Sequence, residues 1–322
     1  MADVINAAVA VVGVPLVLVG YIVLAERLVA RLRERWQRRV RPWVWLAPAL
    51  AFLGVFLVYP TINTIILSFQ NSAGSEFVGF ANYEYFFGTG GGLSALKNNA
   101  LWLVFFSGLA VGLGLLIAVL VDRFRYESLA KTVIFLPLAI SFVGAGVIWS
   151  FMYAVQTPPA PQTGTLNALI VATGANPIAW MPNSTTNNPA LITVGAWMWT
   201  GFCMVILSAN LKSISPELLE AARVDGANEW QVFRRIVFPL LQPSIYVVGT
   251  TMIITALKAF DIVYVMTNGA FDTDVVANMM YREMFSNSQF GRASAVAVIL
   301  FVAIVPFMLL NIRRFREQEA QR

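Results

Sequence analysis

Long apolar runs constrain this chain more than any other feature of its sequence. About 20 mostly apolar residues are needed to cross the ~30 Å hydrocarbon core of a bilayer. Runs of about this length occur at 4–25, 43–69, 100–121, 132–153, 190–210, 244–266 and 292–311. The 322-residue chain is 58% hydrophobic and only 12% charged, whereas soluble chains are about a quarter charged. We therefore expect an all-α membrane protein with seven transmembrane helices.

The basic residues predict the direction in which these helices cross. Lysine and arginine collect on the cytoplasmic side of membrane proteins. With the N-terminus outside and the C-terminus inside, 18 of the 22 basic residues lie in inside segments. Many of them follow the first run, between Arg27 and Arg41. That stretch is either a plain topology anchor or a helix on the anionic leaflet, because Leu28, Leu32 and Trp36 recur every four residues.

The composition argues against an enzyme. The chain has no histidine and a single cysteine, Cys203, which excludes an internal disulfide and a His/Cys metal site. Cys203 lies in an apolar run and is predicted to be a small buried residue. No G-x-x-x-x-G-K-[ST] sequence is present, so the chain lacks that phosphate-binding loop. We expect no catalytic residues, no cofactor and no nucleic-acid partner, and energy must come from another chain or from an ion gradient.

A polar stretch at 215–239 interrupts the second half of the chain. Ser215 and Pro216 predict a helix start, with a capping hydroxyl and a proline at the first helical position. Glu217 adds negative charge to the first turn, where the helix dipole favours it. Asp225 and Gly226 predict the end of this helix, because glycine accepts a left-handed conformation.

A second helix is predicted to follow at once. Asn228 and Gln231 have the spacing of a capping box. Trp230 and Phe233 are expected to anchor this helix to the rest of the protein, and Pro239 is expected to end it. The predicted shape is helix, tight turn, helix, which suits docking to a partner rather than chemistry.

The same stretch contains a characteristic set of residues: Glu220, Ala221, Ala222, Asp225, Gly226, Ile236 and Pro239. With these residues it resembles the EAA loop of ABC importer permeases. Phe238 departs from the family pattern, which usually has leucine there. In the resembling family this loop is the coupling helix that seats in a cleft of the cytoplasmic ATPase. The alternative is an ordinary cytoplasmic hairpin between two membrane spans.

The resemblance extends from about Trp43 to the C-terminus. Elements typical of sugar permeases are Pro48–Leu50, Tyr59–Pro60, Ser68–Phe69 and Gly79–Tyr83, although Ala270 and Phe271 replace two residues of the family's T-x-G-G-P element. The resemblance implies a type I importer domain. Its expected parts are an extra helix and basic segment (1–42), a first core helix and external loop (43–94), a transmembrane core (95–312) with its coupling loop (211–243), and a basic tail (313–322).

The resemblance also implies partners and a substrate class. It is greatest to the maltose and alpha-glucoside branch, so a di- or oligosaccharide is the expected cargo, although nothing in the sequence names the sugar. The expected partners are a second homologous permease, two copies of a cytoplasmic ABC ATPase that binds ATP and magnesium, an extracytoplasmic sugar-binding protein and membrane lipid. The expected location is the inner membrane of a bacterium or archaeon.

The sixth run contains two charged residues, Lys258 and Asp261. Three positions apart in a helix, they would share a face, and charges within a span usually face a cavity or each other. They are either a neutralising pair or part of a substrate route whose other predicted members are Thr255, Ala259, Phe260 and Tyr264. As an alternative function, the pair would serve an ion-coupled secondary transporter.

Other residues carry structural predictions. Gly108 and Gly112 have the spacing that allows membrane helices to approach closely. Pro137 is expected to kink the fourth span. Further aromatic and polar candidates for a sugar cavity are Trp197, Trp199 and Asn210.

Overall fold

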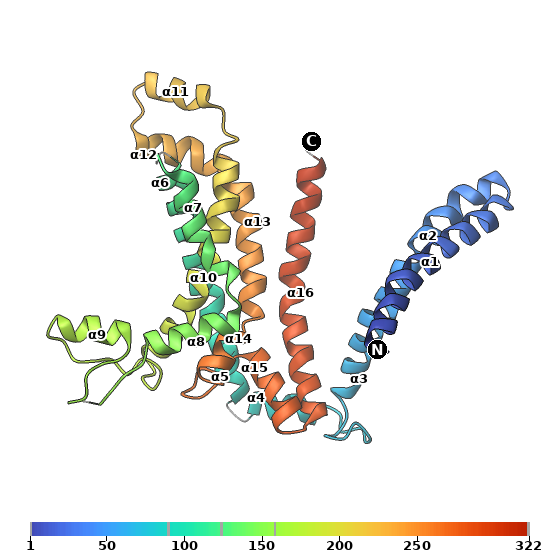
Figure 1. The fold of residues 1–322 in the computed structure, drawn as a ribbon, viewed down its shortest axis with the longest axis horizontal. Helices are drawn as coiled ribbons and strands as arrows, with labels where there is room; N and C mark the ends of the chain where they lie inside the picture. Colours follow the sequence, from blue (N-terminus) through green and yellow to red (C-terminus); the bar gives the residue numbers. More distant parts are fainter. Residues whose placement is uncertain (1, 89–90, 123–124, 158, 321–322) are drawn as a thin grey trace. The chain divides into compact units, whose positions relative to one another are not determined.

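The computed structural model describes residues 2–88, 91–122, 125–157 and 159–320. It contains two compact units, Met1–Ile66 and Leu67–Arg322 (Figure 1). Within the described ranges the chain is helical, and β-structure is limited to an isolated antiparallel bridge between Gln70 and Phe77. The all-α prediction is confirmed. The four parts predicted from the sequence are functional segments and not compact units, so this division stays a prediction.

The first unit is a helical hairpin. α1 (Ala2–Ala30) turns at residues 31–33 and packs against α2 (Glu34–Leu53). α2 continues through the π-helical η1 (Gly54–Val58) into α3 (Tyr59–Leu67). The basic stretch is therefore the tip of a hairpin. A single surface helix through Leu28, Leu32 and Trp36 is wrong, because the chain reverses between them.

Five helices of the described chain are long and apolar enough to cross a membrane. They are Glu34–Leu67, Gly91–Val121, Asn187–Leu211, Glu229–Leu257 and Phe290–Leu310. A bent pair, Glu127–Ala139 with Phe142–Met152, would be a sixth crossing. α1, a helix of 29 residues, is the remaining member of the predicted seven, and the full number stays a prediction.

Several of these crossings consist of more than one helical segment. In the second unit, one such crossing consists of α5 (Gly91–Leu101), η2 (Trp102–Phe106) and α6 (Ser107–Val121), and another of α12 (Glu229–Val232), η4 (Phe233–Val237) and α13 (Phe238–Leu257). The bent pair consists of α7 (Glu127–Phe135), η3 (Leu136–Ala139) and α8 (Phe142–Met152). α10 (Asn187–Leu211) and α16 (Phe290–Ala320) are single helices. The connecting helices are α4 (Ala81–Gly88), α9 (Thr165–Ala172), α11 (Pro216–Val224), α14 (Asp261–Met266), α15 (Val276–Tyr281) and η5 (Arg282–Ser286).

The predicted kink at Pro137 is confirmed and is large. The two halves of the bent pair meet at 100°. Pro137 lies in the short 3₁₀ segment η3, where its missing N–H removes a helical hydrogen bond. Ser141 then restarts the helix, because its hydroxyl accepts a hydrogen bond from the Gly144 amide at 3.0 Å.

The main core lies between α6, α8, α10, α13 and α14. Within the described chain, Gly108 and Gly112 do not mark the close approach of helices that was predicted, since a Cβ on either would meet nothing within 4 Å. The close approach occurs at Gly114, where a Cβ would lie 2.5 Å from the Cys203 Cβ. Cys203 itself is fully buried, as predicted.

The loops of the second unit gather at two opposite ends of the helices (Figure 1). α11 and α12 lie at one end, together with the end of α6 and the C-terminal end of α16. α4, α9, α14 and α15 lie at the other. At that second end Asn82 folds its loop back, because its side-chain amide donates to the carbonyls of Ser68 at 2.9 Å and Gln70 at 2.7 Å.

Candidate functional site

The polar stretch forms the predicted helix, turn and helix, which we name the docking hairpin (residues 216–232). α11 ends where predicted: Asp225 is its C-cap, and Gly226 has a φ of +85°. The Gly226 amide donates to the Arg223 carbonyl at 3.0 Å, and the Ala227 amide donates to the Ala222 carbonyl at 3.0 Å. The left-handed glycine thus reverses the chain while the last carbonyls of α11 remain bonded.

The predicted capping box at the start of α12 is confirmed. The Gln231 amide donates to the Asn228 side chain at 2.9 Å, and the Asn228 amide donates to the Gln231 side chain at 2.8 Å. An ion pair of 2.9 Å between Arg223 Nε and Glu229 Oε1 joins the two helices across the turn. The turn of the docking hairpin is therefore fixed by interactions between residues close in sequence.

The start of α11 differs from its prediction in one detail. Ser215 holds the N-cap position and Pro216 follows it, but the Ser215 side chain makes no capping bond to the backbone. Its hydroxyl donates instead to the Glu217 carboxylate. This hydrogen bond lowers the pKa of Glu217, so the first turn keeps the negative charge that the helix dipole favours.

One face of the docking hairpin is packed into the protein. Leu219, Ala222 and Val232 belong to a cluster around the buried Leu211 and Leu241. Of the two predicted anchors, Phe233 packs against this cluster, but Trp230 is 66% exposed. Val232, which the sequence analysis did not single out, takes the anchoring position.

Three other apolar side chains of the docking hairpin are largely exposed, within the part that the structure describes. Leu218 is 46% exposed, Val224 is 86% exposed and Trp230 is 66% exposed. Glu220 and Ala221 are exposed beside them. A polar hairpin that presents several large apolar side chains has the character of a protein-binding surface.

The last two predicted coupling positions lie beyond the hairpin. Ile236 is in the π-helical segment η4, and Pro239 is in the first turn of α13. The prediction that Pro239 ends the second helix is wrong, because the helix continues without a break to Leu257. The wider turns of η4 directly before it accommodate the missing N–H of proline. The docking hairpin is therefore continuous with a membrane-crossing helix.

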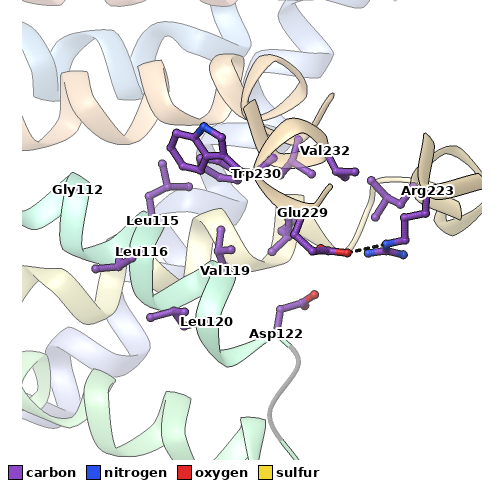
Figure 2. A pocket seen from close by; sticks show the side chains of 14 residues that line it. Gly112, Leu115, Leu116, Val119, Leu120, Asp122, Arg223, Glu229, Trp230 and Val232 are labelled. Atoms are coloured by element: carbon purple, nitrogen blue, oxygen red, sulfur yellow. Dashed lines mark hydrogen bonds and ion pairs between the residues drawn. The ribbon is translucent and has the colours of Figure 1, made fainter. Parts of the chain in front are cut away.

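An apolar groove of about 490 Å³ borders the docking hairpin (Figure 2). Leu115, Leu116 and Val119 of α6 form part of its wall, and Trp230 lines it from the hairpin. Asp122 and the Arg223–Glu229 ion pair add charge to the lining. Trp230 thus lies beside a groove rather than within the core, which accounts for its exposure.

A group of charges holds the helix that leads into the hairpin. Glu127, at the start of α7, pairs with Lys131 and with Lys212, the latter at 2.7 Å. Lys131 also donates to the buried hydroxyl of Ser208 in α10. The hydrogen bond to Glu127 raises the pKa of Lys212. This group was not predicted, because the i,i+4 spacing of Glu127 and Lys131 was its only signal in the sequence.

The second candidate site is a cavity of about 340 Å³ at the end of α13. α13 ends at Leu257, and α14 begins at Asp261. The sequence predicted that Lys258 and Asp261 share a helical face. They do not, because the helix breaks between them. Both line the cavity, and within the described chain no ion pair joins them.

Most of the predicted route residues surround this cavity. Thr255, Ala259 and Phe260 line it together with the two charged residues. Tyr264 does not; its ring packs instead against Phe260 at 5.2 Å and Tyr281 at 5.0 Å.

The aromatic wall of the cavity comes largely from residues that the sequence analysis missed. They are Trp102, Phe106 and Phe142, beside the expected Trp199. Trp197 packs on Trp149, and the Asn210 side chain bonds within its own helix to Ile206. No periodic pattern in the sequence distinguishes Trp102 or Phe106, because apolar residues surround them on every face of this span.

The model of one protein family matches residues 110–315, namely the binding-protein-dependent transport system inner membrane component. The match includes the docking hairpin and most of the cavity lining, whereas Trp102 and Phe106 lie before its first residue. Among curated relatives, the osmoprotective compounds uptake permease protein GgtC of Synechocystis sp. is 51% identical, over 87% of this chain and 100% of the relative. The alpha-glucoside transport system permease protein AglF of Rhizobium meliloti is 45% identical, over 88% of this chain and 85% of the relative.

Solved structures support the fold. A chain of a bacterial ABC transporter that imports the acidic polysaccharide alginate superposes with a TM-score of 0.74 at 24% identity, covering 88% of this chain and 99% of that one. A second structure of the alginate transporter gives a TM-score of 0.72. The chain belongs to the family of inner-membrane components of binding-protein-dependent transport systems, the permease subunits of ABC importers.

Proposed function

We propose that this chain is the sugar-translocating permease of an ATP-driven importer and that the docking hairpin is its ATPase-binding element. Family membership supports the general role and leaves no need for a secondary transporter. The proposed partners are a second homologous permease, two copies of a cytoplasmic ATPase carrying ATP and magnesium, and an extracytoplasmic binding protein. One solved alginate transporter was captured with a pentasaccharide-bound periplasmic protein, which supports such an assembly.

The proposed topology has seven transmembrane helices, with the N-terminus outside and the docking hairpin in the cytoplasm. Its support is the distribution of basic residues, since 18 of 22 fall on the proposed inner side. The opposite ends occupied by α11 and α9 agree with an alternation of inner and outer loops (Figure 1).

The observation that carries the ATPase-binding role is the exposure of large apolar side chains on the docking hairpin. Val224 is 86% exposed at the tip, and Trp230 is 66% exposed. The cost of leaving these side chains in water is relieved when a partner covers them, at roughly 25 cal/mol per Å² of apolar surface. The matching positions Glu220, Ala221 and Gly226 lie beside them.

The mechanism follows from the continuity of the hairpin with the membrane helices. When ATP brings the two ATPases together, a hairpin seated on each moves with it. The motion passes to α13 without a flexible joint, because α12, η4 and α13 are one helix. It passes to α10 through the Leu211 cluster and to α7 through Glu127. The helices then open the cavity outward to receive sugar, and hydrolysis returns it inward.

Val224→Asp tests this role in the purified four-chain core complex. A charge buried in the interface carries a desolvation penalty, so we expect ATPase retention to fall by roughly tenfold or more and ATP-driven uptake to be lost. Val171→Asp is the matched control, because Val171 is an exposed valine, at 43%, on α9 at the other end of the helices. Normal ATPase retention by Val224→Asp would contradict the proposal.

We further propose that the 340 Å³ cavity is part of the sugar route. Aromatic faces suit the apolar side of a sugar ring, and Trp102, Phe106 and Trp199 provide them. Thr255, Lys258 and Asp261 offer hydrogen-bonding groups for its hydroxyls. The name of one relative, an alpha-glucoside permease, favours an α-linked di- or oligosaccharide.

An uptake panel tests the substrate class. Proteoliposomes with the full transporter are offered maltose, trehalose, sucrose, cellobiose, xylose and glycine betaine, and α-linked disaccharides are expected to be preferred. Asp261→Asn should raise the KM by roughly tenfold, because a hydrogen bond to a charged group is lost. Thr193→Val is the control, since Thr193 is exposed and bonds only within its own helix, to Pro189. Preferred uptake of glycine betaine would contradict the sugar class while leaving ATPase binding intact.

A further inference from the structure

We propose that the tip of the hairpin between α1 and α2 binds the headgroup of an anionic phospholipid. We name residues 26–41 the basic tip. It contains seven arginines and two glutamates, a net charge of +5, which equals the net charge of +5 of the whole chain. In the rest of the chain basic and acidic residues are equal in number. The excess positive charge of the protein therefore comes from the basic tip.

Most of this charge lacks an acidic partner. In the described part of the first unit, Arg41 pairs with Glu26, which ties α2 to α1. The remaining arginines of the tip form no ion pair there, and Arg35, Arg38 and Arg39 are exposed. Guanidinium groups that are exposed and form no ion pair are available to an external anion.

Three of the arginines surround a depression in the surface. Arg35, Arg38 and Arg39, with Glu34, line a hollow of about 440 Å³ on the first turns of α2. Their i, i+3, i+4 spacing places the guanidinium groups on one face of the helix. Arginine binds phosphate with two parallel N–H donors, and Glu34 can accept a hydrogen bond from a headgroup hydroxyl. Phosphatidylglycerol offers both a phosphate and hydroxyl groups.

The helix face below the depression fits acyl chains. At 3.6 residues per turn, Arg35, Arg39, Trp43, Leu46 and Leu50 fall within a sector of roughly 80°. Trp43 is 67% exposed, Leu46 is 52% exposed and Leu50 is 45% exposed. A basic head above a continuous apolar strip matches a phospholipid, whereas a free phosphate ion would leave the strip unexplained.

The depth of the arginines agrees with this placement. Trp43 and Trp45 are residues of the type that sit at the membrane interface, and a hydrogen bond from the Tyr21 hydroxyl to the Val44 carbonyl holds the hairpin together at that level. At 1.5 Å per residue, Arg39 lies ~6 Å and Arg35 ~12 Å beyond Trp43. The headgroup layer is about 5–8 Å thick on each side, so the backbone of Arg38 and Arg39 lies at headgroup depth, and that of Arg35 lies about 4 Å beyond the layer.

Lipid titration of the assembled, delipidated complex tests the proposal. Short-chain phosphatidylglycerol is added in detergent, and the bound lipid is counted by native mass spectrometry. The triple variant R35Q/R38Q/R39Q should weaken binding by roughly tenfold or more, since each arginine near an anionic surface contributes appreciably. R35K/R38K/R39K keeps the charge but loses the paired donors. Its affinity for the lipid should therefore lie between that of the unmodified protein and that of the glutamine variant.

The matched control is R27Q/R31Q/R33Q, which removes the same charge from the basic tip but outside the depression. We expect it to weaken binding by less than about threefold. Equal losses in the two glutamine variants would overturn the site in favour of diffuse attraction. Equal binding of glycerol 3-phosphate, which has no acyl chains, would overturn the lipid assignment. Equal binding of phosphatidylcholine with the same chains would mean ordinary lipid contact only.

Discussion

Replacing Gly226 with alanine tests how the turn of the docking hairpin determines ATPase binding. Gly226 has a φ of +85° between α11 and α12. A Cβ at this position would meet nothing within 4 Å, so alanine causes no collision. The remaining penalty is the left-handed backbone itself, which costs an L-residue roughly 1–2 kcal/mol.

This penalty sets the size of the expected effect. A loss of 1–2 kcal/mol changes an equilibrium by about 5- to 30-fold. We expect the amides of Gly226 and Ala227, which bond back to α11, to exchange hydrogen faster by this factor in Gly226→Ala. ATPase affinity should fall within the same range. Gly226→Asn should recover part of the loss, because asparagine tolerates the left-handed region better than alanine.

Gly174 provides a matched control for the same substitution. It has a φ of +84° and also has nothing within 4 Å of a Cβ position. It follows α9, at the end away from the docking hairpin. Gly174→Ala should leave ATPase affinity unchanged. If both alanine variants weaken ATPase binding equally, or if asparagine and alanine behave alike at Gly226, the reasoning from the turn is refuted.

Three further predictions concern the packing of the second unit. Gly114→Val should lower the Tm, at a cost of about 1–3 kcal/mol from overpacking against Cys203, while Gly112→Val should leave it unchanged; equal shifts would contradict the assigned approach. Glu127→Gln removes the carboxylate between two lysines, so the Tm should fall more at low salt than at high salt; a salt-independent change would exclude an electrostatic role. Asn82→Leu leaves the two carbonyls without their donor and should cost about 1–3 kcal/mol for each buried group left unpaired, measured by thermal unfolding; an unchanged Tm would contradict it.

The docking hairpin could be predicted from sequence because its determinants are local. A left-handed glycine and the Asn228–Gln231 box act within a few residues, and the structure contains both. The prediction for Pro239 also used a local rule, and there it was wrong. A proline ends a helix only when the preceding backbone cannot adjust, and the π-helical turns of η4 adjust here.

The cavity could be predicted only in part. The charge of Lys258 and Asp261 within an apolar run marked the region, because charges in a span are costly. The break between them was not predictable, since Lys258–Phe260 contains no proline or glycine. The aromatic wall of Trp102, Phe106 and Phe142 comes from η2 and α8, which are far apart in sequence, and such contacts depend on tertiary packing.

The glycine prediction failed for a related reason. Spacing alone selected Gly108 and Gly112, but close packing requires that a glycine face its neighbour. Gly114 faces α10 at Cys203, and the rotation of α6 about its axis determines which glycine does so. A uniformly apolar helix carries little sequence information about that rotation.

Cross-linking from the tip of the docking hairpin shows whether this hairpin contacts the ATPase. Cys203 is the single cysteine and is fully buried, so a cysteine introduced at Val224 can be labelled selectively with a photoreactive group. In the assembled transporter we expect cross-links from Val224→Cys to the ATPase chain. Leu169→Cys, at an exposed leucine of α9, should give none. Cross-links to the ATPase from Leu169→Cys and not from Val224→Cys would contradict the account.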